Sequence, residues 1–258
     1  MTPQHEQHEL FPSLWGALWL VLASFVCESM TLSVMAELMP DAGLMAQAAL
    51  ARLLGDGMLF TGLLAFKRLG YGELFHTGPS SVRATLALTL LPVMALVPGL
   101  LVVGGWIVSM LADWFPMSEW EQRAFSEMAA LSPAALVMTC LLAPVLEEML
   151  FRGIILRSFL KRYPPGVAIV HSAAVFGLAH MNVYQFFGAM LLGLTLGWLY
   201  ERTRSLWPCI ALHMSYNVAV TWLAQADSAA DVSGGVIVAA LLSSALAATW
   251  LRRTLRSA

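Results

Sequence analysis

Ionisable and amide side chains interrupt three apolar stretches of this chain. Glu147 and Glu148 lie side by side in the first stretch, His180 lies in the second, and His213 and Asn217 lie in the third. A charged group at the centre of a membrane helix costs about 2.5 kcal/mol or more, so such groups indicate function. Carboxylates, imidazoles and an amide on apolar segments therefore predict acid–base chemistry carried out inside a membrane.

The composition supports this membrane setting. Hydrophobic residues make up 59% of the 258 residues, charged residues 12%, and the mean hydropathy is +0.74. Apolar runs of roughly 18 or more residues are typical of transmembrane helices. We expect an all-α, polytopic membrane helix bundle with about eight transmembrane helices, at 13–35, 43–66, 84–111, 132–155, 166–182, 185–200, 206–224 and 233–251. Residues 1–258 are expected to form a single integral membrane domain, because no repeat or long linker divides them.

Lysine and arginine are distributed unevenly among the predicted loops. Cytoplasmic loops carry the excess of these residues in membrane proteins. The predicted loops on the opposite side hold Arg123 alone, together with acidic residues that include Asp227 and Asp231. The distribution and the short loops predict an integral protein of a bacterial inner membrane with both termini cytoplasmic. Eleven of the fourteen cations follow the second, fourth, sixth and eighth spans: Lys67, Arg68, Arg83, Arg157, Lys161, Arg162, Arg202, Arg204, Arg252, Arg253 and Arg256.

Other compositional features limit the kinds of partner that the protein is expected to bind. The net charge is -2 and no basic stripe is present, which excludes nucleic acid as a partner and leaves the lipid bilayer. Cys27, Cys140 and Cys209 are isolated, without the paired spacing of metal or redox sites. We interpret these cysteines as small packing residues. No feature of the sequence indicates an oligomeric state.

Helical periodicity decides which polar groups share a face. Residues four apart are neighbours on a helix surface, so Glu148 and Arg152 are expected to pair, whereas Glu147 points elsewhere. Pro144 lacks a backbone N–H and should loosen the helix around Cys140. Such a distortion is tolerated at membrane depth only where protein or a water-filled cavity covers it.

Depth along the helices brings the polar groups together. At about 1.5 Å per residue, Glu147 lies roughly 15 Å from Arg157, and His180 lies roughly 21 Å from the start of its span. On the same rule, His213 and Asn217 lie roughly 13 and 20 Å from the cytoplasmic end of theirs. Three predicted helices therefore present their polar groups near the middle of the bilayer.

Three motifs, in this order, carry a resemblance to a known family. They are Glu-Glu-x-x-x-Arg at 147–152, Phe-x-x-x-His at 176–180 and His-x-x-x-Asn at 213–217. As a set, they resemble the CAAX protease and bacteriocin-processing family of intramembrane endopeptidases, also called CPBP or Abi, which includes the CAAX prenyl endopeptidases. The resemblance covers roughly 140–224, which is expected to contain the catalytic core.

The resemblance implies a role for each motif residue. Glu147 with His180 would activate a water molecule, and His213 with Asn217 would stabilise the oxyanion of a peptide carbonyl under attack. One oxyanion donor in a dry site contributes roughly 3 kcal/mol. Supporting roles fall to Glu148 and Arg152, which would hold the first helix in register, and to Phe176, which is expected to pack. The implied substrate is a peptide or a membrane-anchored protein.

Other protease chemistries require residues that differ from these motifs. Zinc held by Glu147, His180 and His213, with one open position, stays possible. The His-Glu-x-x-His helix of zinc proteases is absent, so we favour a glutamate-type enzyme without a cofactor. A serine mechanism lacks the Gly-x-Ser-x-Gly elbow. Asp56, preceded by Gly55, lacks the further glycine and the partner Tyr-Asp of aspartyl intramembrane proteases.

Non-catalytic interpretations are also open. Polar side chains often join membrane helices, so either histidine taken singly fits a hydrogen-bonding role, and the pair Glu148–Arg152 fits a structural ion pair. A proton-coupled transporter, or an immunity or scaffold protein of the same fold without catalysis, are the alternative functions. A second polar group, Glu28, Arg52 and Asp56, is predicted to be a separate interhelical network rather than a substrate-binding site.

Overall fold

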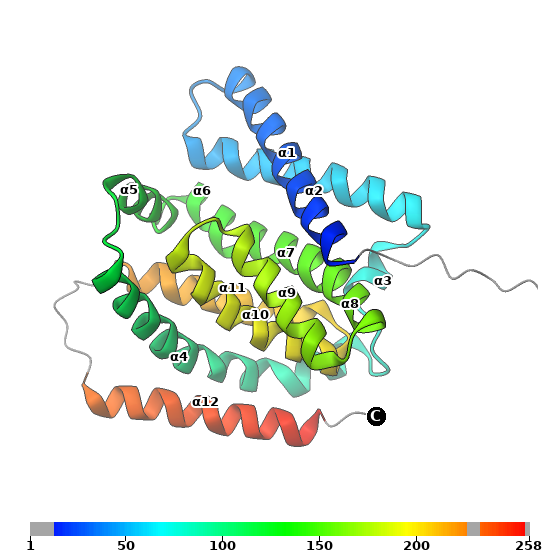
Figure 1. The fold of residues 1–258 in the computed structure, drawn as a ribbon, viewed down its shortest axis with the longest axis vertical. Coiled ribbons are helices and arrows are strands. Elements are labelled where there is room, and N and C mark those ends of the chain that lie inside the picture. The colour runs from blue at the N-terminus through cyan, green and yellow to red at the C-terminus, as the bar shows by residue number, and fades with distance from the viewer. Residues whose placement is uncertain (1–12, 226–232, 256–258) are drawn as a thin grey trace, which may run out of the picture.

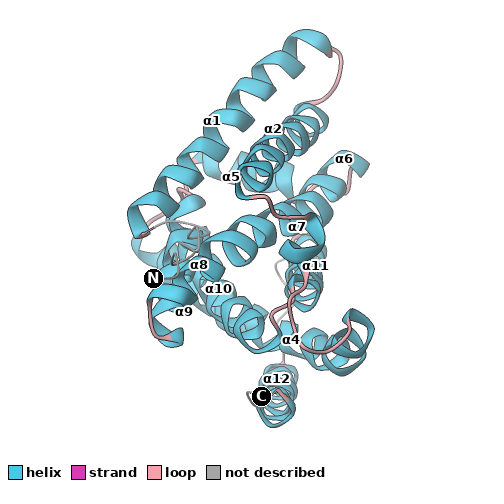
Figure 2. Cartoon of the chain, turned by 90° about the vertical axis from the view of Figure 1, so that its right-hand side faces the viewer, coloured by secondary structure: helices cyan, strands magenta, loops and turns pink. Residues whose placement is uncertain are grey.

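The computed structural model describes residues 13–225 and 233–255, and its regular elements are helices (Figures 1 and 2). Within these ranges no strand forms, although an isolated antiparallel bridge joins His76 and Ser205. The predicted all-α, polytopic fold is confirmed. Arg256, Asp227 and Asp231, which entered the predicted orientation, lie outside the described residues.

The order of elements follows the predicted spans closely. Each of the eight predicted ranges coincides with a helix or with a continuous run of helices. The elements are α1 (Leu14–Leu38), α2 (Leu44–Lys67), α3 (Tyr71–Phe75), α4 (Val82–Trp114), α5 (Glu119–Met128), α6 (Pro133–Leu136), η1 (Val137–Leu142), α7 (Ala143–Glu148), η2 (Met149–Leu156), α8 (Arg157–Arg162), α9 (Pro165–Ala179), α10 (Val183–Thr203), α11 (Leu206–Leu223) and α12 (Gly234–Thr254). Of these, η1 and η2 are π-helices.

Six of the described helical stretches are long and apolar enough to cross a membrane, by length and composition. They are α1, α2, α4, the continuous run Pro133–Arg162, α10 and α12. The apolar helix α9 is shorter, with 15 residues, because the chain turns at His180. α11 has 18 residues but is not among the six. His213 and Asn217 lie in α11 and lower its hydropathy.

The helices form a bundle with two outlying pairs (Figure 1). α1 and α2 pack against each other on one side, and α12 packs on α4 on the opposite side, with the Pro133–Arg162 run and α9–α11 between them. Ser244 of α12 fixes the second pair, because its hydroxyl accepts from Gly99 N and donates to Ala95 O, each at 2.9 Å. Ser244 thus satisfies the N–H of Gly99, directly after Pro98, and the carbonyl of Ala95 in the preceding turn.

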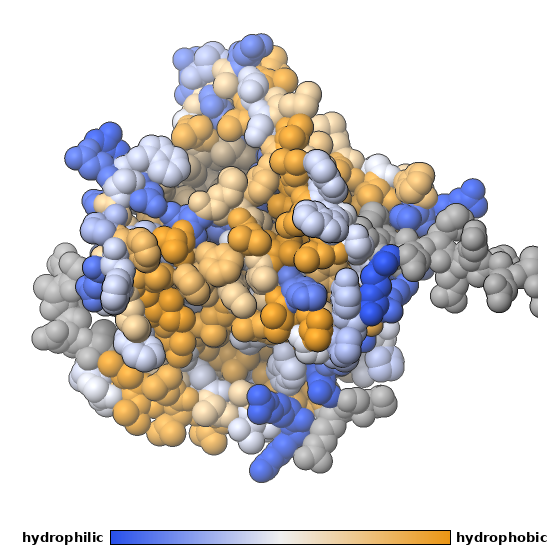
Figure 3. Space-filling view, viewed as in Figure 1, coloured by the Kyte–Doolittle hydropathy of each residue, from blue (hydrophilic) through white to orange (hydrophobic). Residues whose placement is uncertain are grey.

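The loops predicted to be cytoplasmic gather at one end of the bundle. Thr77 N donates to Arg204 O at 2.9 Å, and Arg157 Nη1 donates to Glu73 O at 2.8 Å. At the other end, Asn182 Nδ2 donates to Glu121 Oε1 at 2.7 Å. The space-filling view shows a hydrophobic surface between hydrophilic patches at the edges (Figure 3). The bundle therefore has two polar ends separated by an apolar band, as an integral membrane protein requires.

Candidate active site

The helix that carries the two glutamates departs twice from α geometry. η1 precedes α7 and η2 follows it, so Glu147 and Glu148 close a short α-helical segment between two π-helices. Pro144 has no N–H for the carbonyl of Cys140, and Cys140 lies within η1. The predicted loosening around Cys140 thus takes the form of a π-helix. π-Helical turns are rare and occur frequently at functional sites.

Glu148 lies at the centre of a buried charge network. Its Oε1 accepts hydrogen bonds from Arg152 Nη1 at 2.9 Å and from His213 Nδ1 at 2.8 Å, and the side chains of Glu148 and Arg152 are both 0% exposed. The predicted ion pair is confirmed, and it extends to α11. Because Nδ1 of His213 donates to a carboxylate, the imidazole ring is held in one orientation.

Arg152 has three kinds of partner. Besides Glu148, its Nη2 donates to Gly193 O of α10 at 3.3 Å, and its guanidinium lies 4.6 Å from the centre of the Phe176 ring. A cation over an aromatic face is attracted by the ring, most strongly where water is excluded. Arg152 therefore ties the glutamate helix to both α9 and α10.

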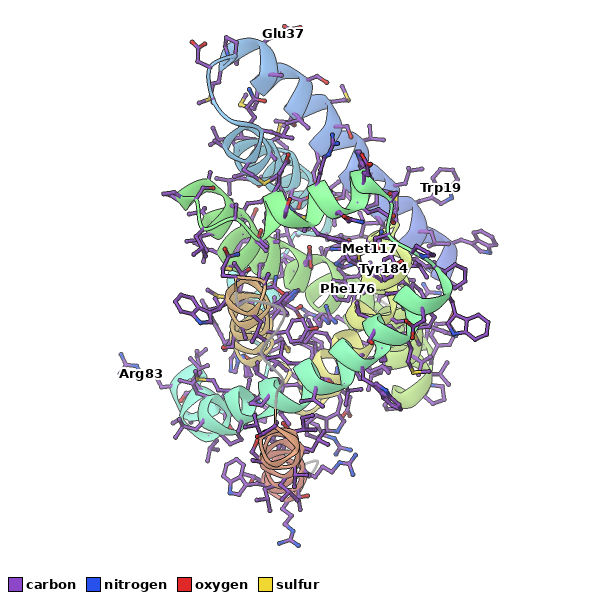
Figure 4. The ribbon with its side chains drawn as sticks, turned by 90° about the vertical axis from the view of Figure 1, so that its left-hand side faces the viewer. Trp19, Glu37, Arg83, Met117, Phe176 and Tyr184 are labelled. Carbon is purple, nitrogen blue, oxygen red and sulfur yellow. The ribbon has the colours of Figure 1, made fainter. Side chains whose placement is uncertain are left out.

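Phe176 fills the space between the charged groups. Its ring meets those of His180 and His213 edge-on, with centroids 4.9 and 5.8 Å away. Figure 4 shows Phe176 in the interior of the bundle, whereas Trp19 and Arg83 project away from it. The Phe176 ring packs tightly against α10, since a Cβ added at Gly193 would lie only 3.2 Å from Cδ1 of the ring. The packing role predicted for Phe176 is present, and α9 and α10 approach each other closely at Gly193.

Glu147 points away from Glu148, as the periodicity predicted, and has its own partners. Its Oε1 accepts from Arg52 Nη2 at 2.9 Å, and its Oε2 lies 3.7 Å from His213 Nε2. His213 therefore lies between two carboxylates, with one ring nitrogen toward each. The side chain of Glu147 keeps 12% of its surface exposed, in contrast to Glu148, which is fully buried.

His180 lies directly after α9, at the turn into α10. Its Nδ1 is 2.8 Å from the carbonyl oxygen of Phe176. A carbonyl only accepts, so Nδ1 donates in this hydrogen bond and Nε2 takes no part in it. His180 and His213 both lie within electrostatic range of the Glu147 carboxylate. The arrangement brings two proton acceptors, Glu147 and His180, to the same region.

A tight turn fixes the position of His180. Met181 adopts a left-handed backbone conformation with φ of 50°, and the side chain of Asn182 accepts from the N–H groups of Tyr184 and Gln185 to cap α10. Asn182 also donates to Glu121 of α5. Two hydrogen bonds from Ser118 lower the pKa of Glu121 below the ordinary value of glutamate, the larger effect coming from the backbone N–H and the smaller from the hydroxyl. This carboxylate is therefore charged at neutral pH.

Asn217 contacts the first π-helix. Its Nδ2 donates to Thr139 O at 2.9 Å, one turn along α11 from His213. This contact uses one of the two amide protons, so one N–H is left to donate. The structure thus places Asn217 beside η1, on the same helix as His213 but bound to the backbone of the glutamate-bearing segment.

Arg52 is the site residue that the sequence analysis missed. The predicted network of Glu28, Arg52 and Asp56 exists, because Arg52 Nε lies 3.7 Å from Glu28 Oε1 and 3.8 Å from Asp56 Oδ2. Its predicted separation from Glu147 is wrong, since Arg52 Nη2 binds that carboxylate directly. The spacing of Arg52 and Asp56 offered a local partner and concealed the longer contact. The sequence signal for a further role of this group was that two acids, Glu28 and Asp56, accompany a single arginine in the first two apolar spans.

Glu147, His180 and His213 are the residues that could hold a zinc ion. Among the described residues, no three His, Cys, Asp or Glu side chains gather where they would hold a metal ion. Oε1 of Glu147 is bound by a guanidinium. Nδ1 of His213 and of His180 contact a carboxylate and a carbonyl, which leaves Nε2 of each ring as the nitrogen that could bind a metal. A cation at Glu147 would therefore have to share the carboxylate with Arg52.

The chain was compared with known proteins. Residues 129–219 match the family model described as type II CAAX prenyl endopeptidase Rce1-like. A protein of Bacillus subtilis (strain 168), named "Putative membrane peptidase YdiL", is 26% identical over 98 residues, which are 38% of this chain and 40% of that protein. The match thus spans less than half of the relative. No solved structure matches the chain.

The fold and the comparisons together indicate the class of protein. Its apolar helical bundle defines an integral membrane protein, and the charged network inside it defines one that bears a buried polar site. The part that carries all three motifs, within residues 129–219, is similar to the type II CAAX prenyl endopeptidase Rce1-like family. The resemblance inferred from the motifs at 147–152, 176–180 and 213–217 is confirmed.

Proposed function

We propose that the protein is an intramembrane endopeptidase that hydrolyses a peptide bond near or within the bilayer. The observation that supports this most directly is the convergence of Glu147, His180 and His213 from three helices of an apolar bundle. The family match supports the same class of reaction. The substrate is a peptide or a membrane-anchored protein.

In the proposed mechanism, Glu147 and His180 accept a proton from water. Oε2 of Glu147 and Nε2 of His180 hold lone pairs that the Arg52 and Phe176 contacts leave free. The oxygen of the water attacks the peptide carbonyl carbon, and its proton passes to one of these two acceptors. The C–N bond then breaks, and the same proton goes to the leaving amine. A positioned general base typically contributes about 10²–10⁴-fold to the rate.

Two donors are proposed for the oxyanion. Nε2 of His213, when protonated, and the second N–H of Asn217 are the groups available on α11. Glu148 fixes the ring of His213 through Nδ1, and Arg152 fixes Glu148. The buried pair thus acts on the donor rather than on the substrate. A donor held in place before the reaction needs no reorganisation as negative charge develops.

The enzyme is proposed to be of the glutamate type, without a metal cofactor. This is supported by the guanidinium of Arg52 on Glu147, since a cation at that oxygen repels a second one. Elemental analysis of purified protein, with activity measured before and after chelation, tests the point. Stoichiometric zinc that must be restored for activity would overturn it.

We also propose the cellular setting. The whole chain is taken as one integral membrane domain of a bacterial inner membrane, with 140–224 as the catalytic core and both termini cytoplasmic. The gathering of the cation-bearing loops at one end of the bundle supports this orientation. The peptide bond cleaved would then lie at the level of Glu147, inside the hydrophobic band.

One observation favours a different function. His213 lies between Glu147 and Glu148 with one ring nitrogen toward each, and His180 lies near Glu147, so Glu147, His180 and His213 could form a proton relay. Proton flux into liposomes that depends on Glu147, without any cleavage, would support a proton-coupled transporter. A protein inert in both assays would be the immunity or scaffold type.

The test of the proposed function compares membrane proteomes from cells that express the wild type, Glu147→Gln or Glu119→Gln. Glu119 is a matched acidic control, since its side chain is 87% exposed on α5. We expect new protein termini with the wild type and with Glu119→Gln, and their loss with Glu147→Gln. Termini that persist at equal level in Glu147→Gln would contradict the proposed role of Glu147.

A further inference from the structure

Arg52 lies outside the region that resembles the protease family. It belongs to α2, whereas the matched residues are 129–219. Its Nη2 is nevertheless 2.9 Å from Oε1 of Glu147, the shortest link between the first two helices and the candidate active site among the described charged contacts. No role follows for Arg52 from the three motifs.

The surroundings of Arg52 hold it in place. Nε lies within 4 Å of Glu28 on α1 and of Asp56 on α2. Ser24 ties these two acids together, since its hydroxyl lies 2.5 Å from Asp56 Oδ1 and 3.3 Å from Glu28 Oε1. A planar guanidinium with fixed donors suits such a site better than a flexible ammonium.

The backbone next to Arg52 is also fixed. At Gly55, α1 and α2 approach so closely that a Cβ would lie 3.0 Å from the backbone of Cys27 and of Glu28. Small residues at such contacts allow membrane helices to pack tightly. The helical pair α1–α2 therefore supports Arg52 rigidly, and the same two helices carry the acids that surround it.

We propose that Arg52 is a positioning residue of the active site, which orients the Glu147 carboxylate by binding Oε1 and directs Oε2 toward His213 and the reacting water. This inference rests on the proposed function. It makes the first helical pair part of the catalytic apparatus. Glu28, Asp56 and Ser24 anchor Arg52 and act through it.

The first experiment tests the contact without any activity measurement. Thermal unfolding in detergent is measured for Arg52→Gln, Glu147→Gln and the double variant. Residues in contact give non-additive changes, whereas distant residues add. We expect the double variant to melt no lower than the less stable single variant. Strictly additive losses would show that Arg52 does not hold Glu147, whatever the protein catalyses.

The second experiment tests the role. On a substrate cleaved by the wild type, Arg52→Gln should lower kcat by about 10–100-fold, the size of effect that a misplacement of about 1 Å produces, while KM stays within a factor of two. Arg52→Lys, which keeps the charge, should recover part of the loss. Arg123→Gln is the matched control, because Arg123 is exposed on α5, and should leave kcat unchanged.

Each result bears on the inference. Wild-type kcat in Arg52→Gln, higher kcat in that variant, or an effect confined to KM would overturn positioning while leaving the protease proposal intact. Loss of kcat in Arg52→Gln without any recovery in Arg52→Lys would point to a structural role and would also overturn it. If the wild type cleaves nothing, the proposed function fails, and the unfolding cycle still decides the contact.

Discussion

Breaking the buried pair of Glu148 and Arg152 should destabilise the protein far more than breaking an exposed pair of the same spacing. Both side chains are 0% exposed, with 2.9 Å between Arg152 Nη1 and Glu148 Oε1. Removal of one member leaves an uncompensated buried charge, which costs about 3–5 kcal/mol. Glu148→Gln and Arg152→Gln should therefore each cost about that much unfolding free energy.

The two single variants should not lose the same amount of unfolding free energy. Arg152→Gln also loses the contact with the Phe176 ring, 4.6 Å away, worth up to about 2 kcal/mol where water is excluded. Glu148→Gln instead leaves Arg152 over that ring and near Gly193 O. We expect Arg152→Gln to lie at the upper end of the range. The double variant, which leaves neither charge unpaired, should be milder than either single.

Thermal melts of purified protein in detergent provide the assay. At about 2–4 °C per kcal/mol for a chain near this size, each single variant should melt at least about 6 °C lower. The matched control is Glu119 with Arg123, an exposed pair of the same spacing at 3.2 Å, whose loss should cost about 0–1 kcal/mol. Strictly additive losses in the double variant of Glu148 and Arg152 would refute the reasoning.

Three further predictions concern packing, pH and orientation. Gly193→Ala places a Cβ 3.1 Å from Ala173 Cβ and should cost about 1–3 kcal/mol in melts, whereas Gly188→Ala, with nothing within 4 Å, should be neutral. Because the pKa of Glu121 is lowered in the folded protein, its contribution to the docking of α5 is present above pH 4.5 and is lost as pH falls through the folded pKa. A spin label at Arg123→Cys should therefore gain mobility at low pH, and already at neutral pH in Glu121→Gln. A label that stays immobile in both cases would contradict this. In intact cells of a cysteine-free background, an impermeant thiol reagent should modify Arg123→Cys and spare Arg253→Cys, and the reverse pattern would invert the topology.

Local features of the site followed from the sequence because they depend on neighbouring residues. The spacing of four predicted the pair Glu148–Arg152, and the missing N–H of Pro144 predicted the distortion that η1 shows around Cys140. Hydropathy predicted the helical ranges, since the apolar runs must bury their backbone in helices at membrane depth. The resemblance to the protease family was likewise carried by local spacings.

Contacts between distant helices were not predictable in the same way. Arg52 has a local partner four residues away in Asp56, and nothing in its spacing indicates that Nη2 reaches Glu147, 95 residues along the chain. The bond from Asn217 to Thr139 O depends on where α11 meets η1, which the sequence of neither segment specifies. Such contacts arise from packing, and packing is decided by the whole bundle.

Glu147, His180 and His213 form the proposed catalytic site. Its most direct test is the cleavage rate of purified protein in liposomes, on a substrate identified from the wild-type proteome, for Glu147→Gln, His180→Ala and His213→Ala. Removing an acid–base group or an oxyanion donor should lower the rate by a factor of about 100 or more. Near-wild-type rates in all three folded variants would contradict the assignment of the site.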